Sequence, residues 1–178
     1  MRLKKIIKQL EGKFPLELAE EWDNVGLLLD STRREIKSIM LCLDITRDVV
    51  DKAVANKVDL IISHHPFIFS PLKKITTDEV NGEKILKLAR NNIAVYSMHT
   101  NIDSGIGGLN DFIIKKIGQE GKVFVISDNR CVELRKLVTG DLIDAKDKII
   151  NPLRIQKLKS AITIEELCKI IKEKLCIP

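Results

Sequence analysis

The sequence predicts an α/β fold in which helices cover a mostly parallel sheet. Three short apolar segments, residues 36–44, 58–63 and 93–97, have the length and composition of buried strands. Apolar residues recur at helical spacing between them, around residues 46–54 and 82–90. Strand–helix–strand repetition is typical of a parallel sheet with helices on its faces. Since such crossovers are right-handed, the carboxyl ends of the three strands are expected along one edge.

Local signals place the other elements of the first 118 residues. Residues 3–10 are predicted as a helix and residues 15–22 as a short second helix. Thr46 is a suitable N-cap for the helix that follows it, because its hydroxyl can accept a hydrogen bond from the first turn. The glycines of residues 105–108 interrupt the chain before another helix, near residues 109–118.

The pattern beyond about residue 120 predicts fewer elements. Residues 123–127 and 131–138 are predicted as two strands that could pair antiparallel, and residues 140–158 match no element clearly. Thr163 and Glu166 form a capping box, which predicts the start of a helix. Its apolar face would consist of Ile164, Leu167, Cys168, Ile171 and Leu175.

The composition indicates a globular protein rather than a membrane or nucleic-acid-binding one. The chain has 178 residues, of which 44% are hydrophobic, and these suffice for one good core or two small lobes. The net charge of +5 comes from basic residues interleaved with acidic ones, which favours a solvated surface over a nucleic-acid interface. No segment has the length of an apolar membrane span.

The four cysteines favour a reducing compartment. Cys42, Cys131, Cys168 and Cys176 form no CxxC pair, so a thiolate zinc site is disfavoured. Cys42 lies in an apolar segment and Cys168 on the apolar face of a predicted helix, which indicates buried, reduced thiols. The first residues precede no long apolar segment of a signal peptide. A cytoplasmic location is therefore expected.

All three histidines follow predicted strand ends, where ligands bind in open α/β sheets. His64 and His65 would point to opposite faces within a strand, so they can converge only where Pro66 ends it. Two adjacent imidazoles fit more easily on two ions, about 3.5–4 Å apart, than on one. Asp103 could ligate or bridge such ions, and His99 could ligate, carry protons or orient a ligand.

The alternative is that these residues bind no metal. A histidine in a loop is more often a surface residue, and an aspartate before Ser-Gly more often belongs to a turn. It is less expected by chance that all three histidines follow strand ends. The pattern by itself therefore favours neither the metal site nor its absence. Imidazole and carboxylate ligands suit zinc, iron or manganese without selecting one of them.

Several segments resemble signatures of the dinuclear-metal hexameric family, also called NGG-interacting-factor-three-like or GTP cyclohydrolase type-two-like. The most specific is residues 59–66 (DLIISHHP), which carries the two adjacent histidines. The others are residues 22–27 (WDNVGL), 42–46 (CLDIT), 97–103 (SMHTNID) and 107–111 (GGLND). The resemblance covers about residues 1–118.

The resemblance implies a site of two divalent metal ions, of zinc, iron or manganese type. It also implies two similar α/β lobes and a homo-oligomer, a ring of six built as a trimer of dimers, whose metal sites face an inner cavity. A small molecule would be the substrate, and nucleic acid is disfavoured as a partner. The resemblance implies His64, His65 and Asp103 as metal ligands and places His99 next to the ligands rather than among them. Asn24 and Gly26 would lie near the mouth of the site, where we expect them to bind substrate. Because His99 could move protons beside the metal, we expect it to be the catalytic group.

The chain departs from the family pattern in its last third. Residues 153–156 keep the Arg and Ile of a GRIG-like turn but lack its flanking glycines. The family's late His, and the Glu four residues after it, complete the metal pair and have no matching position here. We therefore expect an N-terminal metal-binding lobe at residues 1–120, the start of a truncated second lobe at residues 121–178, and a site that holds one ion or none.

Three functions follow from these features. The first is a metal-dependent hydrolase acting on nucleotide-like substrates, in which a metal-bound water is the nucleophile. The second is a non-enzymatic ring or adaptor in which the metal has a structural role, because a fold does not determine function. The third is an inactive remnant, which the missing ligands favour.

Overall fold

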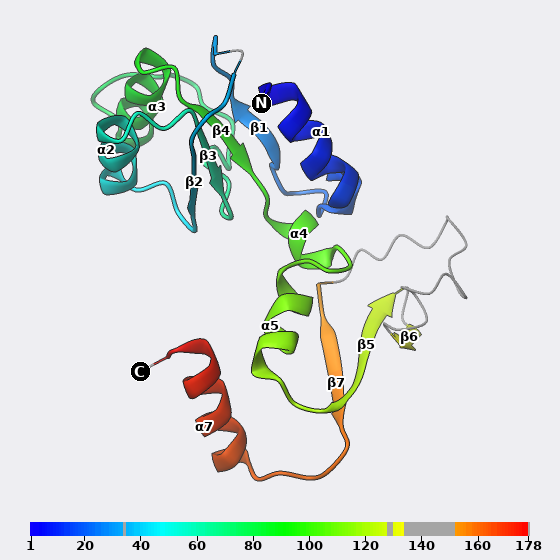
Figure 1. Cartoon of the computed structure of the whole chain (residues 1–178). Helices are drawn as coiled ribbons and strands as arrows, with labels where there is room; N and C mark the ends of the chain where they lie inside the picture. Colours follow the sequence, from blue (N-terminus) through cyan, green and yellow to red (C-terminus); the bar gives the residue numbers. More distant parts are fainter. Residues whose placement is uncertain (34, 128–129, 134–151, 178) are drawn as a thin grey trace. The chain divides into compact units, whose positions relative to one another are not determined.

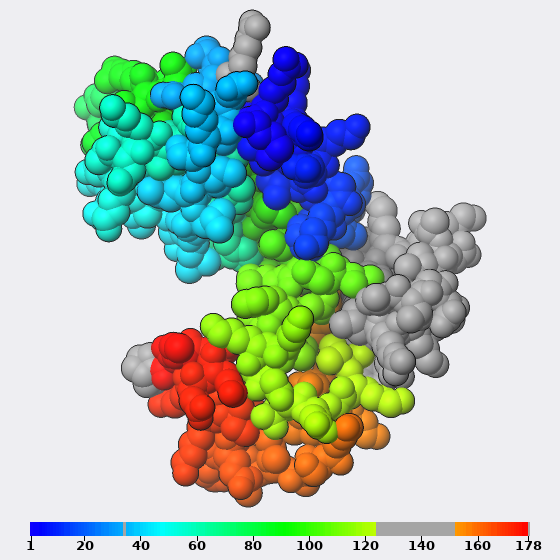
Figure 2. Space-filling model, viewed as in Figure 1, coloured from blue at the N-terminus to red at the C-terminus, as the bar shows by residue number. Residues whose placement is uncertain are grey.

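The structure, a computed structural model, describes residues 1–33, 35–127, 130–133 and 152–177. They form two compact units, Met1–Asn101 and Ile102–Pro178. Figure 1 traces the chain, and Figure 2 shows the surface of the first unit in blue, cyan and green. The sequence-based boundary after residue 120 stays a prediction. Of the helices in these ranges, none is both long and apolar enough to cross a membrane.

A four-stranded sheet forms the middle of the first unit. It contains β1 (Gly26–Leu29), β2 (Ile39–Cys42), β3 (Leu60–Ser63) and β4 (Ala94–Ser97), in the order β1-β4-β3-β2. Strands β2, β3 and β4 are parallel, and β1 pairs antiparallel with β4, which confirms the predicted mostly parallel sheet. Cys42, Ser63 and Ser97 are aligned at the ends of the parallel strands, so these ends share one edge (Figure 1).

Helices precede and connect the strands of this sheet. They are α1 (Leu3–Lys13), the 3-10 turn η1 (Leu16–Leu18), α2 (Arg47–Ala55) and α3 (Val80–Arg90). Thr46 caps α2 as predicted, because its Oγ1 accepts a hydrogen bond from the Val49 N–H at 3.2 Å. The helix predicted at residues 15–22 shortens to η1. The Glu20 N–H donates to the Thr100 hydroxyl at 3.0 Å rather than to a helical carbonyl.

Both faces of the central strands are buried. Ile61 and Val95 belong to the cluster that also includes Leu88 of α3, and this face of the sheet is covered by α2 and α3. Tyr96 follows Val95 and therefore points to the opposite face. Its hydroxyl donates to Glu11 Oε1 of α1 at 3.5 Å. The sheet is thus the middle layer between α1 and the α2–α3 pair.

The second unit contains a small antiparallel sheet and helices. Its elements are α4 (Thr100–Ser104), which begins at the end of the first unit, α5 (Leu109–Ile117), β5 (Gly121–Ser127), β6 (Arg130–Glu133), β7 (Arg154–Leu158) and α7 (Ile164–Leu175). The strand order is β6-β5-β7, with both pairs antiparallel. The pairing of β5 with β6 confirms the predicted strands as far as Glu133, and residues 134–138 lie outside the described residues. Strand β7 falls within residues 140–158, where the sequence indicated no element.

The predicted capping box begins α7. The Thr163 N–H donates to Glu166 Oε2 at 3.0 Å, and the Glu166 N–H donates to Thr163 Oγ1 at 3.1 Å. The apolar face of α7 is only partly covered, because Ile164 is 78% exposed. Helix α5, which packs against α7, is shorter and covers part of that face.

The cysteines are free where the structure describes them. Cys42 is half-buried beside the core of the first unit. Cys168 and Cys176 are exposed, so the expectation of buried thiols is wrong for both of them. The partial cover of α7 explains the exposure of Cys168. The side chain of Cys131 lies outside the described residues.

Arg154 connects β7 to the turn between α4 and α5. Its side chain is almost completely buried, and its Nε donates to Asp111 Oδ1 at 2.5 Å. One terminal nitrogen donates to the Ser104 carbonyl at 3.0 Å. Asp111 also accepts from the Gly107 N–H at 2.6 Å. The arginine of the GRIG-like turn therefore organises the second unit without the flanking glycines.

Asp59 fixes the segment before β2 to the start of β3. Its buried carboxylate accepts hydrogen bonds from the N–H groups of Lys37 and Ser38, at 2.7 and 3.0 Å, and pairs with Arg33 at 2.9 Å. Burial opposes ionisation, but the hydrogen bonds and Arg33 outweigh it and hold the pKa of Asp59 below its ordinary value of 3.8.

We expect Asp59→Asn to lower the free energy of unfolding by roughly 2 kcal/mol at neutral pH, because charge-assisted hydrogen bonds are lost. Since the pKa of Asp59 is lowered by folding, its stabilisation is fully present above 3.8 and is lost as the pH falls through the lowered pKa. The difference from wild type in urea unfolding should therefore shrink in acid. Asp51→Asn, at an exposed ion pair with Lys87, is the control. An equal difference at every pH would contradict this account.

Candidate metal centre

The three histidines of the chain lie together at the carboxyl edge of the sheet. His64 and His65 directly follow β3, and His99 follows β4 after Met98. The ring centroids are 5.2 Å apart for His64 and His65, 5.1 Å for His64 and His99, and 5.6 Å for His65 and His99. One ring nitrogen of each lies within 4.8 Å of the others. The structure thus brings together the histidines that the sequence singled out.

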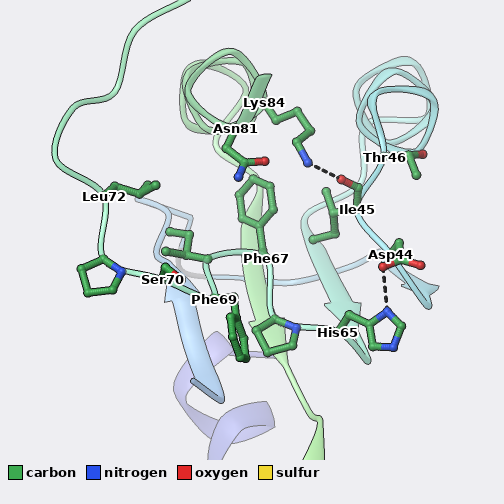
Figure 3. Close-up of a pocket in the computed structure, with 13 residues that line it drawn as sticks. Asp44, Ile45, Thr46, His65, Phe67, Phe69, Ser70, Leu72, Asn81 and Lys84 are labelled. Carbon is green, nitrogen blue, oxygen red and sulfur yellow. Dashed lines mark hydrogen bonds and ion pairs between the residues drawn. The ribbon is translucent and has the colours of Figure 1, made fainter. Parts of the chain in front are cut away.

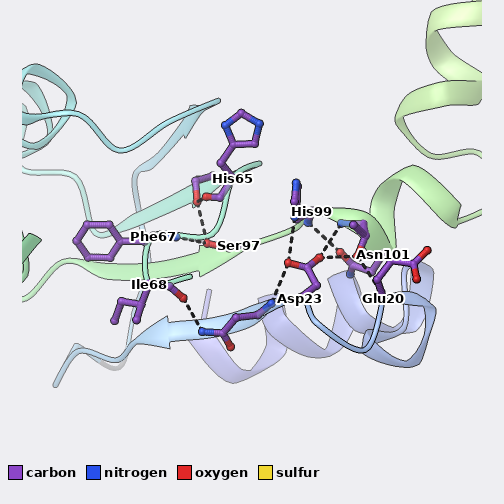
Figure 4. A network of polar contacts seen from close by, with 11 residues as sticks. Glu20, Asp23, His65, Phe67, Ile68, Ser97, His99 and Asn101 are labelled. Atoms are coloured by element: carbon purple, nitrogen blue, oxygen red, sulfur yellow. Dashed lines mark hydrogen bonds and ion pairs between the residues drawn. The ribbon is translucent and has the colours of Figure 1, made fainter. Parts of the chain in front are cut away.

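Two serines at the strand ends hold the histidine turn in place. The hydroxyls of Ser63 and Ser97 are buried and 2.8 Å apart. Ser63 Oγ also donates to the His65 carbonyl at 2.8 Å, and Ser97 Oγ accepts from the Phe67 N–H at 3.4 Å (Figure 4). The His64 N–H continues the sheet by donating to the carbonyl of the last residue of β2 at 3.0 Å. The turn at Pro66 therefore begins from a rigid base.

A carboxylate from the neighbouring strand end orients His65. Asp44 follows β2, and its Oδ1 lies 2.7 Å from His65 Nδ1. An ionised carboxylate can only accept a hydrogen bond, so Nδ1 carries the hydrogen and Nε2 presents its lone pair. Carboxylates commonly fix metal-binding histidines in this way. His65 is therefore prepared to bind a metal through Nε2.

A second carboxylate orients His99 in the same manner. Asp23 is fully buried, and its Oδ1 lies 3.0 Å from His99 Nδ1 (Figure 4). Asp23 also accepts hydrogen bonds from the N–H and hydroxyl of Thr100 and from the Asn24 N–H. Burial raises the pKa of Asp23, but the hydrogen bonds from Thr100, His99 and Asn24 outweigh burial and lower it. The carboxylate thus stays ionised and leaves His99 Nε2 available.

The sequence interpretation missed Asp23 and Asp44 as functional residues. Both lie in segments that carry the family resemblance, residues 22–27 and 42–46, and Asp44 follows a predicted strand end. The place of Asp44 just after a predicted strand was the sequence feature that could have identified it as a site residue. The pairing of the two carboxylates with His99 and His65 depends on contacts between strands that no local pattern contains.

Asn24 and Gly26 have clear structural roles. The Asn24 side chain donates to the Ile68 carbonyl at 2.5 Å, which joins its segment to the loop after the histidines. Gly26 begins β1 opposite Ser97 with φ of 100°, a conformation that other residues rarely adopt. Their predicted part in substrate binding stays a prediction.

Asp103 lies on α4, in the second unit. Its backbone carbonyl accepts a hydrogen bond from Asn110 Nδ2 at 3.2 Å. The structure describes the histidines within the first unit, so the predicted role of Asp103 as a metal ligand stays a prediction.

Exposed aromatic side chains border the histidines. Trp22 is 61% exposed, and its ring centroid lies 6.1 Å from those of both Phe69 and His99. Imidazole nitrogens oriented by carboxylates, next to an open surface, form a donor set that fits a zinc, iron or manganese ion.

The chain matches the Duf34/NIF3 (NGG1p interacting factor 3) family over residues 1–178. It belongs to this family. The chain is 35% identical over 173 residues to a protein of Clostridium acetobutylicum named GTP cyclohydrolase 1 type 2 homolog, covering 97% of this chain and 59% of that protein. It is 42% identical over 117 residues to NIF3-like protein 1 of Drosophila melanogaster, covering 65% and 40%.

Solved structures show the same fold. Reduced HcgD from Methanocaldococcus jannaschii superimposes with a TM-score of 0.74 at 30% identity, covering 97% of this chain and 60% of HcgD. Staphylococcus aureus protein SA1388 gives a TM-score of 0.73 at 24% identity, covering 100% and 66%, which supports the fold alone. The matches thus span between 40% and 66% of the length of these relatives.

We expect Asp44→Asn to weaken zinc binding by the chain about tenfold, because the hydrogen bond that orients His65 loses its charge. Titration calorimetry with zinc measures the change. Asp48→Asn is the matched control, since Asp48 is exposed and pairs with Lys52 away from the histidines. Equal zinc affinity in Asp44→Asn and wild type would show that Asp44 does not support a metal ligand.

Proposed function

We propose that the chain binds divalent metal through His64 and His65 and supports metal-dependent hydrolysis of small, nucleotide-like molecules. The observation that carries the proposal is the meeting of three histidine nitrogens, within 4.8 Å of one another, at the carboxyl edge of the sheet. The name GTP cyclohydrolase 1 type 2 homolog, carried by relatives, supports the hydrolytic part. Two ions side by side are the arrangement that adjacent imidazoles favour, and zinc, iron and manganese suit the donors.

The proposed roles follow from the hydrogen bonds of each ring. A bound divalent ion would lower the pKa of a water molecule toward neutrality and so supply the nucleophile. His64 and His65 would be metal ligands. His99 carries protons between the reacting group and solvent, because the buried carboxylate of Asp23 orients its ring toward the site.

A ring of six copies, built as a trimer of dimers, is part of the same proposal. Strand β2 is an edge strand, and its Ile39 and Leu41 are 46% and 75% exposed. Apolar side chains on an open strand edge are typical of surfaces that another protein covers. Light scattering on the purified chain measures its mass, and a monomer at all concentrations would exclude the ring. We place the protein in the cytoplasm, where its exposed thiols would stay reduced.

We expect the wild-type chain to retain zinc after dialysis and His65→Ala to lose most of it, because a metal ligand is removed. Metal analysis by mass spectrometry measures the stoichiometry. Cys168→Ala is the control, since its thiol is one of the two exposed thiols, with that of Cys176, among the described residues that could hold zinc adventitiously. Zinc loss in Cys168→Ala but not in His65→Ala would place the ion away from the histidines.

We expect His99→Gln to keep metal and to lose at least about 100-fold in turnover, the contribution typical of proton transfer. The assay follows hydrolysis of GTP and other nucleotides by metal-loaded and metal-free protein. Loss of metal together with turnover would show instead that His99 is a ligand. The absence of metal-dependent turnover on the whole panel would refute the enzyme and favour the adaptor role.

A further inference from the structure

A cavity of about 550 Å³ opens beside His65, outside the histidine cluster itself. Its volume is in the range of sites for small molecules. It lies between the loop that follows the histidines, the segment that leads into α2 and the start of α3 (Figure 3). Its lining includes Asp44, Thr46, Phe67, Phe69, Asn81 and Lys84. The cavity thus begins at the proposed metal centre and extends away from it.

Lys84 gives the cavity a fixed positive charge. Its ammonium donates to the Ile45 carbonyl at 2.7 Å and lies 5.4 Å from the Phe67 ring centroid. Burial, followed by the nearby Arg47, lowers the pKa of Lys84, whereas Asp44 raises it. An ammonium has three N–H donors, so the bond to Ile45 leaves others for a ligand.

Lys84 differs from the neighbouring cations of the surface in the group that it contacts. Arg47 pairs with Glu83 at 2.8 Å, and Lys87 pairs with Asp51 at 2.6 Å. Within the described residues, the Lys84 ammonium contacts a backbone carbonyl rather than a carboxylate. A partly desolvated cation of this kind binds an anion more strongly than a lysine in open solvent does.

The rest of the lining is mostly apolar and aromatic. Phe67 is 6% exposed and forms a wall, and Phe69 is 52% exposed. Thr46 and Asn81 add uncharged polar groups to this lining. Sites with apolar walls and a small number of polar groups bind the flat or apolar part of a ligand and orient its polar end. Figure 3 shows Lys84 and His65 on different sides of the cavity.

We propose that this cavity is the substrate pocket of the histidine site and takes a small aromatic molecule with a phosphate or carboxylate group. The anionic oxygens bind Lys84, the ring packs against Phe67 and Phe69, and the opposite end of the molecule lies toward His65. The identification as a substrate pocket rests on the proposed function, whereas the binding of the anion does not.

The test uses phenyl phosphate, benzoate and inorganic phosphate as probes of the full chain in the presence of a chelator. Calorimetry should show that phenyl phosphate or benzoate binds more tightly than inorganic phosphate. Lys84→Gln should weaken that binding about tenfold or more, because a charge-assisted hydrogen bond is lost. Lys84→Arg keeps the charge and should retain most of the affinity. Lys87→Gln, one turn further along α3, should bind as wild type does.

The variants also test the aromatic part. Phe69→Ala should weaken phenyl phosphate binding and leave the affinity for inorganic phosphate unchanged. Stronger binding of phenyl phosphate than of benzoate identifies phosphate as the anion, and the reverse order identifies carboxylate. Failure of both to bind, or equal losses in Lys84→Gln and Lys87→Gln, would overturn the proposal. Because the chelator removes metal, the binding assay tests the anion pocket independently of the proposed hydrolase. If the probes bind through Lys84 but the chain shows no metal-dependent turnover, the hydrolase proposal is refuted and the anion-binding proposal is not.

Discussion

The parallel, in-register pairing of β3 with β4 is the constraint on which the site depends. Ser63 and Ser97 are partners at the ends of these strands, and their hydroxyls meet in the core 2.8 Å apart. The residues that follow them therefore leave the sheet at the same edge, and these residues include all three histidines. A slip of one residue would turn the side chains of a strand to the opposite face. The same pairing thus specifies the core and the site.

The topology of the sheet also brings the carboxylates to that edge. Asp44 follows β2, which runs parallel to β3, so it leaves the sheet beside His65. Strand β1 is antiparallel to β4, so β1 begins where the parallel strands end. Asp23 precedes β1 and for this reason meets His99. A mixed sheet with one antiparallel edge strand can therefore place groups from all four strands around one point.

Elements with local signals were predictable from the sequence, and elements that exist through pairing were not. The N-cap of α2 and the capping box of α7 depend on neighbouring residues, and both are present as predicted. Strand β1 contains four residues and exists by pairing with β4. Strand β7 has its two apolar residues, Ile155 and Leu158, three positions apart and so lacks the alternation typical of a strand. Its pairing with β5 and the buried hydrogen bonds of Arg154 hold it in place.

The position of the three histidines after strand ends was predictable from the sequence, because Pro66 and the apolar strands are local features. The sequence also carried the resemblance that the family match confirmed. Which carboxylates orient the rings depends on how the strands are arranged in the fold. Asp23 and His99 are 76 positions apart in the chain, and sequence spacing does not indicate which distant strand ends become neighbours. The cavity between Lys84 and His65 also depends on the fold, since segments that are separate in the sequence form its walls.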